Sequence, residues 1–325
     1  MPLVSVICTT YNHESYIRQA LDGFVIQQCN FPIEVIVHDD ASTDNTAAII
    51  KEYTAKYPFF RAILQAENQF SKGFPIWIYL FTQVAKGKYI AICEGDDYWT
   101  DPHKLQKQVD FLEANEDFAI CFHAVKIKNE STNTLTDDFI TREVPDVTDI
   151  YDLAKDNYIH TPSVIFRKNE EVFSAMVKLG SLPVADYVLH ILNAQYGKIK
   201  KLPEKMAIYR IGVGIWSSKD EVFRLHKWLS VADRLIRFFA DNEKLNLAFL
   251  QQYSGSLFTL YTVYESANDF DTAKKLFLQA CVNHPEVIYN EFKSRSSKLD
   301  RIRNSSVYHW TKPVLRIFNY LKIKK

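Results

Sequence analysis

The sequence predicts an α/β fold, a mostly parallel sheet with helices on both faces, followed by an α-helical C-terminal extension. Apolar runs rich in β-branched residues alternate with helical patterns through roughly the first 100 residues, and right-handed crossovers turn such an alternation into a parallel sheet. From Glu221 onward only helical patterns remain. The length of 325 residues suits one large domain with an extension, or two domains.

The first part of the sheet follows from this alternation. Residues 3–8 and 33–37 are short, β-branched runs typical of strands that are buried on both faces. A helical pattern at 16–26 separates them, and Ser42 or Thr43 can cap a second helix after the second strand. The next elements are a strand at 59–64, a helix at 74–85 and a strand at 88–93.

The second half mixes strands and helices. A helix is expected after Pro102. Residues 129–148, rich in Ser, Thr, Asn and Asp, predict an exposed loop of the length that often serves as a lid or binding segment. The remaining elements are strands at 118–122, 163–166 and 199–211 and a helix at 185–196.

The helical extension contains one hairpin pattern. Residues 257–265 and 273–280 are two helical segments joined by a turn at Asn268 and Asp269, similar to one tetratricopeptide hairpin. A single repeat is not stable alone. The pair is therefore expected either to pack on the rest of the chain or to present a surface to a partner.

The composition excludes several classes of protein. Lys and Arg together number 39, as do Asp and Glu, and 47% of the residues are hydrophobic. A net charge of zero argues against a general nucleic-acid binder, and the apolar content argues against a disordered chain. The five cysteines show no C-x-x-C spacing, so reduced thiols are expected rather than disulfides or a zinc cluster. No apolar run suits a signal peptide or a membrane span, so we expect a cytoplasmic protein.

Polar and acidic clusters stand where the predicted strands end. Residues 9–11, 39–40 and 94–97 each follow a buried strand. In open α/β sheets, ligands bind outside the carboxyl ends of the strands. The three clusters should therefore converge on one crevice.

The acidic clusters predict a bound cation. Buried carboxylates repel one another and resist removal from water, so a positive group is expected between them. The oxygen ligands of Glu94, Asp96 and Asp97 suit Mg²⁺ or Mn²⁺. The alternative is that Asp96 and Asp97 only cap the helix that begins near Pro102.

Three motifs in order resemble the family 2 nucleotide-sugar glycosyltransferases. They occupy residues 4–12, 37–46 and 87–99, and a weaker match continues through residues 161–167, 185–187 and 209–210 to about residue 216. The resemblance implies a GT-A fold and an inverting transfer of a sugar from a nucleoside diphosphate. It also implies a catalytic domain at 1–216, with a nucleotide-sugar-binding half at 1–100 and an acceptor half at 101–216, before a helical extension at 217–325.

The resemblance assigns the donor site. Thr9 and Tyr11 would line the nucleobase pocket, Asp40 would hydrogen-bond the base, and Asp39 would support Asp40.

The third motif is assigned to the ribose and the metal. Asp96 would hold the ribose beside the metal, Asp97 would ligate Mn²⁺ or Mg²⁺, and Glu94 would share one of these roles. A divalent cation would offset the charge that grows on the departing diphosphate.

A general base is also needed to deprotonate the acceptor hydroxyl. Asp186 matches the acidic residue of the family at this place, and the alternative is that it is the N-cap of the following helix.

One departure concerns the segment after Tyr209. Many relatives have a histidine shortly after the Tyr-Arg pair, and this chain has none. Arg210 is therefore expected to bind the diphosphate, with a structural ion pair as the alternative. Trp216 would stack on the sugar or close the core. The weaker candidates for ligands or bases are His38, His123, His160 and His190, of which His190 lies one helical turn after Asp186 and could orient it.

The C-terminal tail is basic from Lys293 onward, with aromatic and aliphatic residues interleaved in 310–325. Such a segment can lie at an anionic membrane surface, and docking onto the protein is the alternative.

Together with the resemblance, these features predict a metal-dependent transfer of a sugar from a nucleoside diphosphate to a hydroxyl. The resemblance alone implies that the transfer is inverting and that UDP is preferred. The acceptor would be a glycan or a lipid-linked molecule in cell-surface polysaccharide synthesis. A nucleotidyltransferase is disfavoured because no Gly-rich, basic loop follows the first strand. The alternative outside enzymes is a non-catalytic nucleotide-sugar-binding scaffold that acts through the helical C-terminal region.

Overall fold

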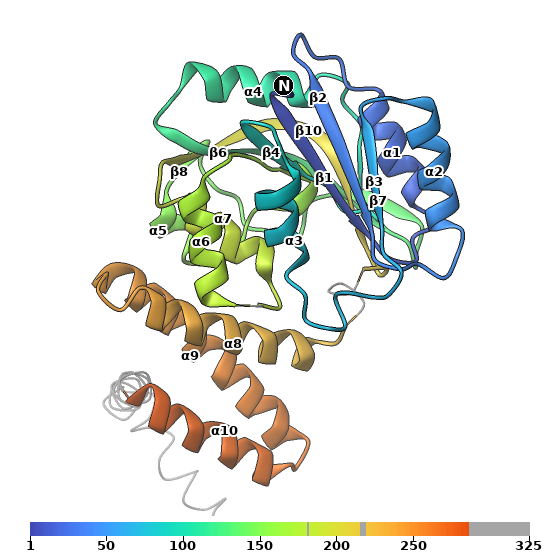
Figure 1. The fold of residues 1–325 in the computed structure, drawn as a ribbon. Coiled ribbons are helices and arrows are strands. Elements are labelled where there is room, and N and C mark those ends of the chain that lie inside the picture. The colour runs from blue at the N-terminus through green and yellow to red at the C-terminus, as the bar shows by residue number, and fades with distance from the viewer. Residues whose placement is uncertain (181, 215–218, 286–325) are drawn as a thin grey trace, which may run out of the picture. The chain divides into compact units, whose positions relative to one another are not determined.

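The computed structural model describes residues 1–180, 182–214 and 219–285 (Figure 1). The chain divides into two compact units, Met1–Phe249 and Leu250–Lys325. Trp216 and the basic tail at 310–325 lie outside the described residues, so the structure does not test the predictions made for them.

The first unit is built on one sheet of ten strands. Eight of them lie in the order β3-β2-β1-β4-β9-β6-β10-β5, while β7 pairs with β6 and β8 pairs with β10. Their bounds are β1 (Val4–Thr10), β2 (Ile33–Asp39), β3 (Phe60–Leu64), β4 (Tyr89–Ile92), β5 (Tyr98–Trp99), β6 (Phe118–Asn129), β7 (Thr134–Asp137), β8 (Val147–Thr148), β9 (Ile165–Arg167) and β10 (Lys198–Ile211).

Parallel pairing holds throughout the N-terminal half of the sheet. Val6 of β1 pairs with Val35 of β2 on one side and with Ala91 of β4 on the other, and β3 adds in parallel beyond β2. The second half is mixed, because β9 runs antiparallel to both β4 and β6, whereas β6 and β10 are parallel to each other. The predicted α/β class is confirmed, with the parallel character concentrated in the first half.

Helices cover both faces of this sheet, as the alternation predicts. The helices of the first unit are α1 (Ile17–Val25), α2 (Thr46–Lys56), α3 (Ile76–Tyr79), the π-helix η1 (Leu80–Val84), α4 (Lys104–Ala114), α5 (Ile150–Leu153), the 3₁₀-helix η2 (Thr161–Ser163), α6 (Glu170–Leu179), α7 (Ala185–Asn193) and α8 (Glu221–Phe238).

Side-chain alternation along β1 places two cores on opposite faces of the sheet. Val4, Val6 and Cys8 share one core with the buried residues of α1, α2 and α4. On the other face, Phe81 of η1 stacks on Phe173 of α6 at 5.3 Å between ring centroids. The strand β1 therefore lies between two packed cores.

Two segments differ from the sequence-based expectation. The helix expected at 74–85 is a short α-helix that continues as a π-helix, and Thr82 donates its hydroxyl to the carbonyl of Ile78 at 2.8 Å, a bond that competes with the helical ladder. The loop expected at 129–148 contains β7, which folds back on an extended β6, and also β8. A tertiary pairing therefore overrides the polar composition of this segment.

The compact first unit reaches beyond the boundary predicted at residue 216. Trp228 of α8 packs edge-on against Tyr187 of α7, with 5.0 Å between ring centroids, and Val231 and Leu235 are fully buried. The apolar face of α8 thus belongs to the first unit, whose end falls inside α9 (Glu243–Ser266).

The predicted helical hairpin of the extension is confirmed. It is formed by α9 and α10 (Phe270–Asn283), with Tyr261 and Phe277 in contact at 6.5 Å between ring centroids. Asp269 caps α10 by accepting a hydrogen bond of 3.1 Å from the backbone N–H of Thr272. Within the described part of the chain, none of the helices has the length and apolar character needed to cross a bilayer.

Candidate functional site

Three strand ends meet at one edge of the sheet. Because β1 lies between β2 and β4, the segments that follow these strands are neighbours. The backbone N–H of Asp40 donates to the carbonyl of Thr10 at 3.0 Å, and that of Gly95 donates to the carbonyl of Thr9 at 3.0 Å. The predicted convergence of the three polar clusters is confirmed.

The loops after β1 and β2 are locked together by side-chain bonds to backbone. Ser42 accepts a hydrogen bond of 2.8 Å from the backbone N–H of Asn12, and Asn12 accepts one of 2.8 Å from that of Thr43. Asn12 adopts a left-handed backbone with φ of 54°, a conformation that asparagine tolerates well. Thr9 is half-buried at the rim and Tyr11 is exposed, so both remain accessible to a ligand.

The two carboxylates after β2 are buried and have different partners. Asp39 accepts hydrogen bonds from the hydroxyl and the backbone N–H of Ser42. Asp40 accepts one hydrogen bond of 2.7 Å from the backbone N–H of Gln69 and one of 3.0 Å from that of Phe70. Each carboxylate oxygen can accept a second bond, so Asp40 keeps capacity for a ligand.

A glycine is required within the acidic turn after β4. A Cβ atom added to Gly95 would lie 2.6 Å from the hydroxyl oxygen and 2.7 Å from the Cβ of Thr10. The close approach of the two strand ends therefore depends on the absence of a side chain at this position.

The acidic turn holds two buried carboxylates and one half-buried carboxylate. Asp96 and Asp97 are 8% and 1% exposed, and Glu94 is half-buried beside them. Burial, followed by repulsion from Asp96, raises the pKa of Asp97 well above its usual value and that of Glu94 to about 8. Such a cluster favours a bound cation, because a cation would offset the repulsion between the buried carboxylates.

The cluster fits a metal ion that is only partly held by protein. Among the described residues, no three or more His, Cys, Asp or Glu side chains are grouped as ligands of one ion. Asp97, with help from Asp96, is the candidate ligand, since carboxylate oxygens suit Mg²⁺ and Mn²⁺. These ions usually keep water molecules and take further ligands from substrate phosphates.

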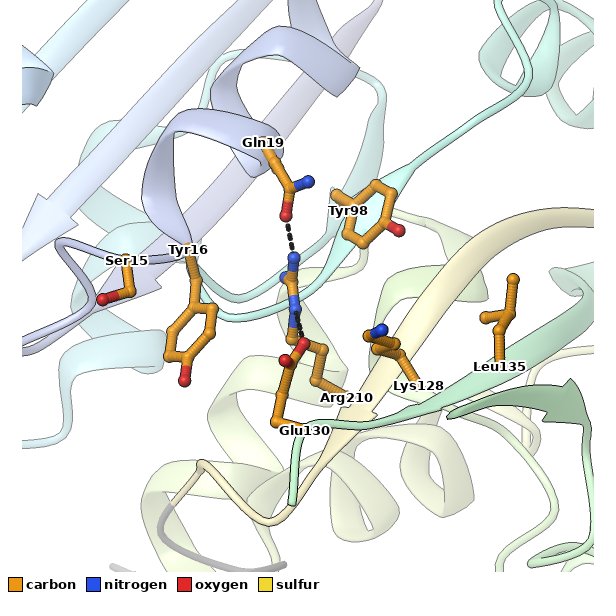
Figure 2. A pocket seen from close by; sticks show the side chains of 8 residues that line it. All are labelled: Ser15, Tyr16, Gln19, Tyr98, Lys128, Glu130, Leu135 and Arg210. Carbon is orange, nitrogen blue, oxygen red and sulfur yellow. Dashed lines mark hydrogen bonds and ion pairs between the residues drawn. The ribbon is translucent and has the colours of Figure 1, made fainter. Parts of the chain in front are cut away.

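Arg210 connects the acidic turn to the neighbouring cavity of about 290 Å³ (Figure 2). Its backbone N–H donates to the Asp97 carboxylate at 2.7 Å, and its guanidinium donates to the backbone carbonyl of Asp96. The same guanidinium forms an ion pair with Glu130 at 2.7 Å and a hydrogen bond with Gln19. The structure therefore shows the ion pair that was the alternative to a diphosphate contact.

Two tyrosine rings flank this guanidinium in Figure 2. Its central carbon lies 5.0 Å from the ring centroid of Tyr16 and 4.6 Å from that of Tyr98. Cation–π contacts of this kind add to the ion pair and fix the orientation of the side chain.

Asp186 lies in the first turn of α7. The N-cap of that helix is Val184, so the alternative that Asp186 is the N-cap is wrong. Asn157 donates a long hydrogen bond of 3.5 Å to the carboxylate. Burial raises the pKa of Asp186, and its charge in turn contributes to the raised pKa of Glu94.

Tyr209 is a site residue to which sequence reasoning gave no role. Burial, and then the charges of Asp97, Glu94 and Asp186, raise the pKa of its hydroxyl well above the usual value. Its ring lies 4.6 Å from that of His160, which pairs with Asp138 at 2.9 Å. Alternation along β10 points Tyr209 to the face opposite Arg210. No local signal therefore indicated Tyr209, and none points to Asp138 or Asn157.

The other three candidate histidines, His38, His123 and His190, are buried. Neither ring nitrogen of His190 has a hydrogen-bond partner, so His190 does not orient Asp186, and burial lowers its pKa to about 3. His38 is within hydrogen-bond distance of Gln65 at 3.1 Å, and His123 of the carbonyl of Ala124 at 2.7 Å.

Comparison with known proteins supports the resemblance. A family model described as Glycosyl transferase family 2 matches residues 5–171. An uncharacterized protein of Mycobacterium tuberculosis is 42% identical over 222 residues, which cover 66% of this chain and 61% of that protein. The chain therefore spans less than two thirds of the length of this relative.

An enzyme of Escherichia coli is similar to this chain over a shorter segment. WfaP, named UDP-Glc:alpha-D-GlcNAc-diphosphoundecaprenol beta-1,3-glucosyltransferase, is 33% identical over 118 residues, which cover 36% of this chain and 44% of that enzyme.

A solved structure shares the fold. The structure of S. aureus TarS 1-349 in complex with UDP-GlcNAc aligns with 85% of this chain and 92% of that chain, with a TM-score of 0.50 and 19% identity. At this identity the likeness concerns the fold, and the GT-A architecture implied by the sequence resemblance is confirmed.

Proposed function

Because the chain belongs to glycosyl transferase family 2, we propose that it transfers a sugar from a nucleoside diphosphate to the hydroxyl of an acceptor. The observation that carries this proposal is the convergence of the carboxylates after β2 and those after β4 at one edge of the sheet. The charge of Asp186 contributes to the raised pKa of Glu94, which supports placing Asp186 beside this edge. Nucleotide-sugar binding by the TarS structure, which shares the fold, supports the choice of donor.

The donor half of the crevice is assigned to the nucleotide. Thr9 and Tyr11 line the base pocket, Asp40 bonds to the base, and Asp39 braces the Asp40 loop through Ser42. UDP is the preferred nucleotide.

The acidic turn is assigned to the ribose, the metal and the diphosphate. Asp96 holds the ribose beside the metal, and Asp97 would ligate Mn²⁺ or Mg²⁺ with support from Glu94. When bound, this cation offsets the negative charge that develops on the departing diphosphate. Arg210 holds Asp97 through its backbone and contributes positive charge to the diphosphate side of the turn.

Asp186 is assigned as the general base. It takes the proton of the acceptor hydroxyl as the oxygen attacks the anomeric carbon from the face opposite the diphosphate, which inverts the configuration of that carbon. Its raised pKa brings its proton affinity closer to that needed near neutral pH. Asn157 and the helix N-terminus orient the carboxylate.

The acceptor is proposed to be a glycan or lipid-linked molecule of cell-surface polysaccharide synthesis, as the name of the related WfaP suggests. The tail at 310–325 is proposed, from its sequence, to contact an anionic membrane. Deleting the chain after Ser306 should weaken binding to phosphatidylglycerol vesicles in a salt-dependent way. Unchanged vesicle binding would favour the alternative that the tail docks onto the protein.

The first test needs no acceptor. Thermal unfolding of the wild type and of Asp97→Asn is measured with UDP-, GDP- and dTDP-sugars, each with Mn²⁺, Mg²⁺ or EDTA. Stabilisation by one donor family that requires metal and is lost in the variant would support the proposal. No stabilisation by any donor would favour the non-catalytic scaffold.

A further inference from the structure

A second hollow of the first unit, here called the α8 groove, lies between two loops and the helix α8. It has a volume of about 550 Å³, and its apolar wall is formed by Phe70, Leu182, Pro183 and Phe223. Both loops come down to α8 in Figure 1. Phe70 is 63% exposed, so its ring offers apolar surface to a ligand in the groove.

The helical side of the α8 groove is basic. Phe223, Lys227 and Arg234 are spaced to share one face of α8. The ammonium of Lys227 lies 5.1 Å from the ring centroid of Phe223, and Arg234 donates a hydrogen bond of 2.6 Å to the carbonyl of Leu179. No carboxylate is among the described residues that line the groove, so its charge is positive.

The α8 groove is lined by residues of the two loops that border the proposed reaction site. The backbone N–H of Phe70 holds the Asp40 carboxylate at 3.0 Å, and Pro183 precedes Asp186 by three residues. The groove therefore borders the loop that holds Asp40 and the segment that leads to Asp186.

We propose that the α8 groove binds the lipid-diphosphate part of the acceptor. This rests on the proposed function and narrows the acceptor class to a sugar carried on a polyprenyl-type diphosphate. Lys227 and Arg234 of α8 bind the diphosphate, and the apolar wall contacts the first units of the hydrocarbon chain. A purely polar glycan would leave the apolar wall uncovered, and a free phosphate would contact only the cations.

The test is direct binding of farnesyl diphosphate to the full-length protein by calorimetry, with farnesol and inorganic pyrophosphate as the two halves of the probe. We expect the intact probe to bind at least about tenfold more tightly than either half, because charge and apolar burial act together. Lys227→Gln should weaken binding by about tenfold through loss of a charge-assisted contact. Arg224→Gln removes a cation from the same helix outside the groove and serves as the matched control.

The outcomes separate the groove from the proposed function. Binding of the probe that is lost in Lys227→Gln and kept in Arg224→Gln supports the proposal. Equal binding in both variants overturns it, as does equal affinity for pyrophosphate alone. A third result would also overturn the proposal. If the wild type does not bind the probe but binds phosphatidylglycerol vesicles, and Lys227→Gln loses that vesicle binding, the groove is a membrane-facing surface. Stabilisation by a nucleotide sugar is measured on the same samples, so failure of the groove with an intact donor response refutes only the groove.

Discussion

The backbone N–H of Arg210 donates a hydrogen bond of 2.7 Å to the carboxylate of Asp97, which ties the end of β10 to the acidic turn after β4. The turn is therefore held by a neighbouring strand in addition to its own loop. The carboxylate keeps its second oxygen for a ligand.

Asp97→Asn should remove metal-dependent donor binding while leaving the fold intact. The asparagine carbonyl can still accept the bond from Arg210, but the charge that attracts the cation is lost. We expect turnover to fall at least about 100-fold, because a catalytic cation is worth several kcal/mol. Donor affinity with and without EDTA is the measurement. Asp110→Asn, on the exposed side of α4, is the control, and a donor response that stays metal-dependent in Asp97→Asn would place the metal elsewhere.

Asp186→Asn should spare donor binding and stop transfer. Removal of a general base costs about 10²- to 10⁴-fold in rate. Glu170→Gln is a matched control, because Glu170 is also an acidic residue in the first turn of a helix. Donor affinity and the initial rate are measured together, and near-normal turnover would exclude Asp186 as the base.

The acid limb of the pH profile should lie above the usual range of an aspartate. Burial raises the pKa of Asp186, and a base acts only when it is ionised, so activity should fall as the pH drops through this raised value. The measurement is kcat/KM against pH at fixed metal concentration. A limb at or below the ordinary carboxyl pKa would contradict the assignment.

Gly95→Ala should destabilise the protein and weaken donor binding. The added methyl would collide with Thr10 at 2.6 Å, and overpacking of this kind costs about 1 to 3 kcal/mol. Gly255→Ala is the opposite case, because nothing lies within 4 Å of its added Cβ and alanine favours a helix by up to about 1 kcal/mol. Urea unfolding distinguishes the two, and equal stability of both variants would show that the turn can adjust.

Lys104→Met should change how stability depends on pH. Lys104 is fully buried, its ammonium donates to Gln108 at 2.8 Å, and burial lowers its pKa to about 7. Above that pH the native lysine loses its proton while the unfolded lysine keeps it, so this group makes the free energy of unfolding rise with pH.

The contribution of Lys104 is at most about 1.4 kcal/mol per pH unit between pH 7 and the ordinary lysine pKa. Methionine does not titrate and lacks this contribution, so the stability difference between wild type and variant should change across pH 6.5 to 9. Lys51→Met on the exposed face of α2 is the control. Parallel stability curves for the wild type and Lys104→Met would show that Lys104 does not titrate in this range.

Much of the proposed donor half could be predicted, because its signals are local. A buried strand is a short apolar run, and in a parallel sheet the residue after it lies at the ligand edge, which located Asp39, Asp40 and the turn at 94–97. The helical hairpin at the C-terminus was also local, since its two helices are adjacent in sequence.

The acceptor half depends on long-range pairing, which the sequence pattern does not reveal. Strand β9 lies antiparallel between β4 and β6, which are distant from it in the chain. Strand β7 pairs with β6, but its polar composition hides this pairing in the sequence. For the same reason Asn157 and Asp138 gave no signal, since each acts through a residue brought close only by the fold. The ion pair of Arg210 with Glu130 joins positions 80 residues apart.

The loop after β3 carries Phe70, whose backbone holds Asp40 and whose ring forms a wall of the α8 groove. A ligand that shifts the backbone of this loop would also shift the N–H that fixes the carboxylate. Thermodynamic linkage then requires that occupancy of one side changes affinity on the other by the same factor. The proposed donor and acceptor should therefore bind cooperatively rather than independently.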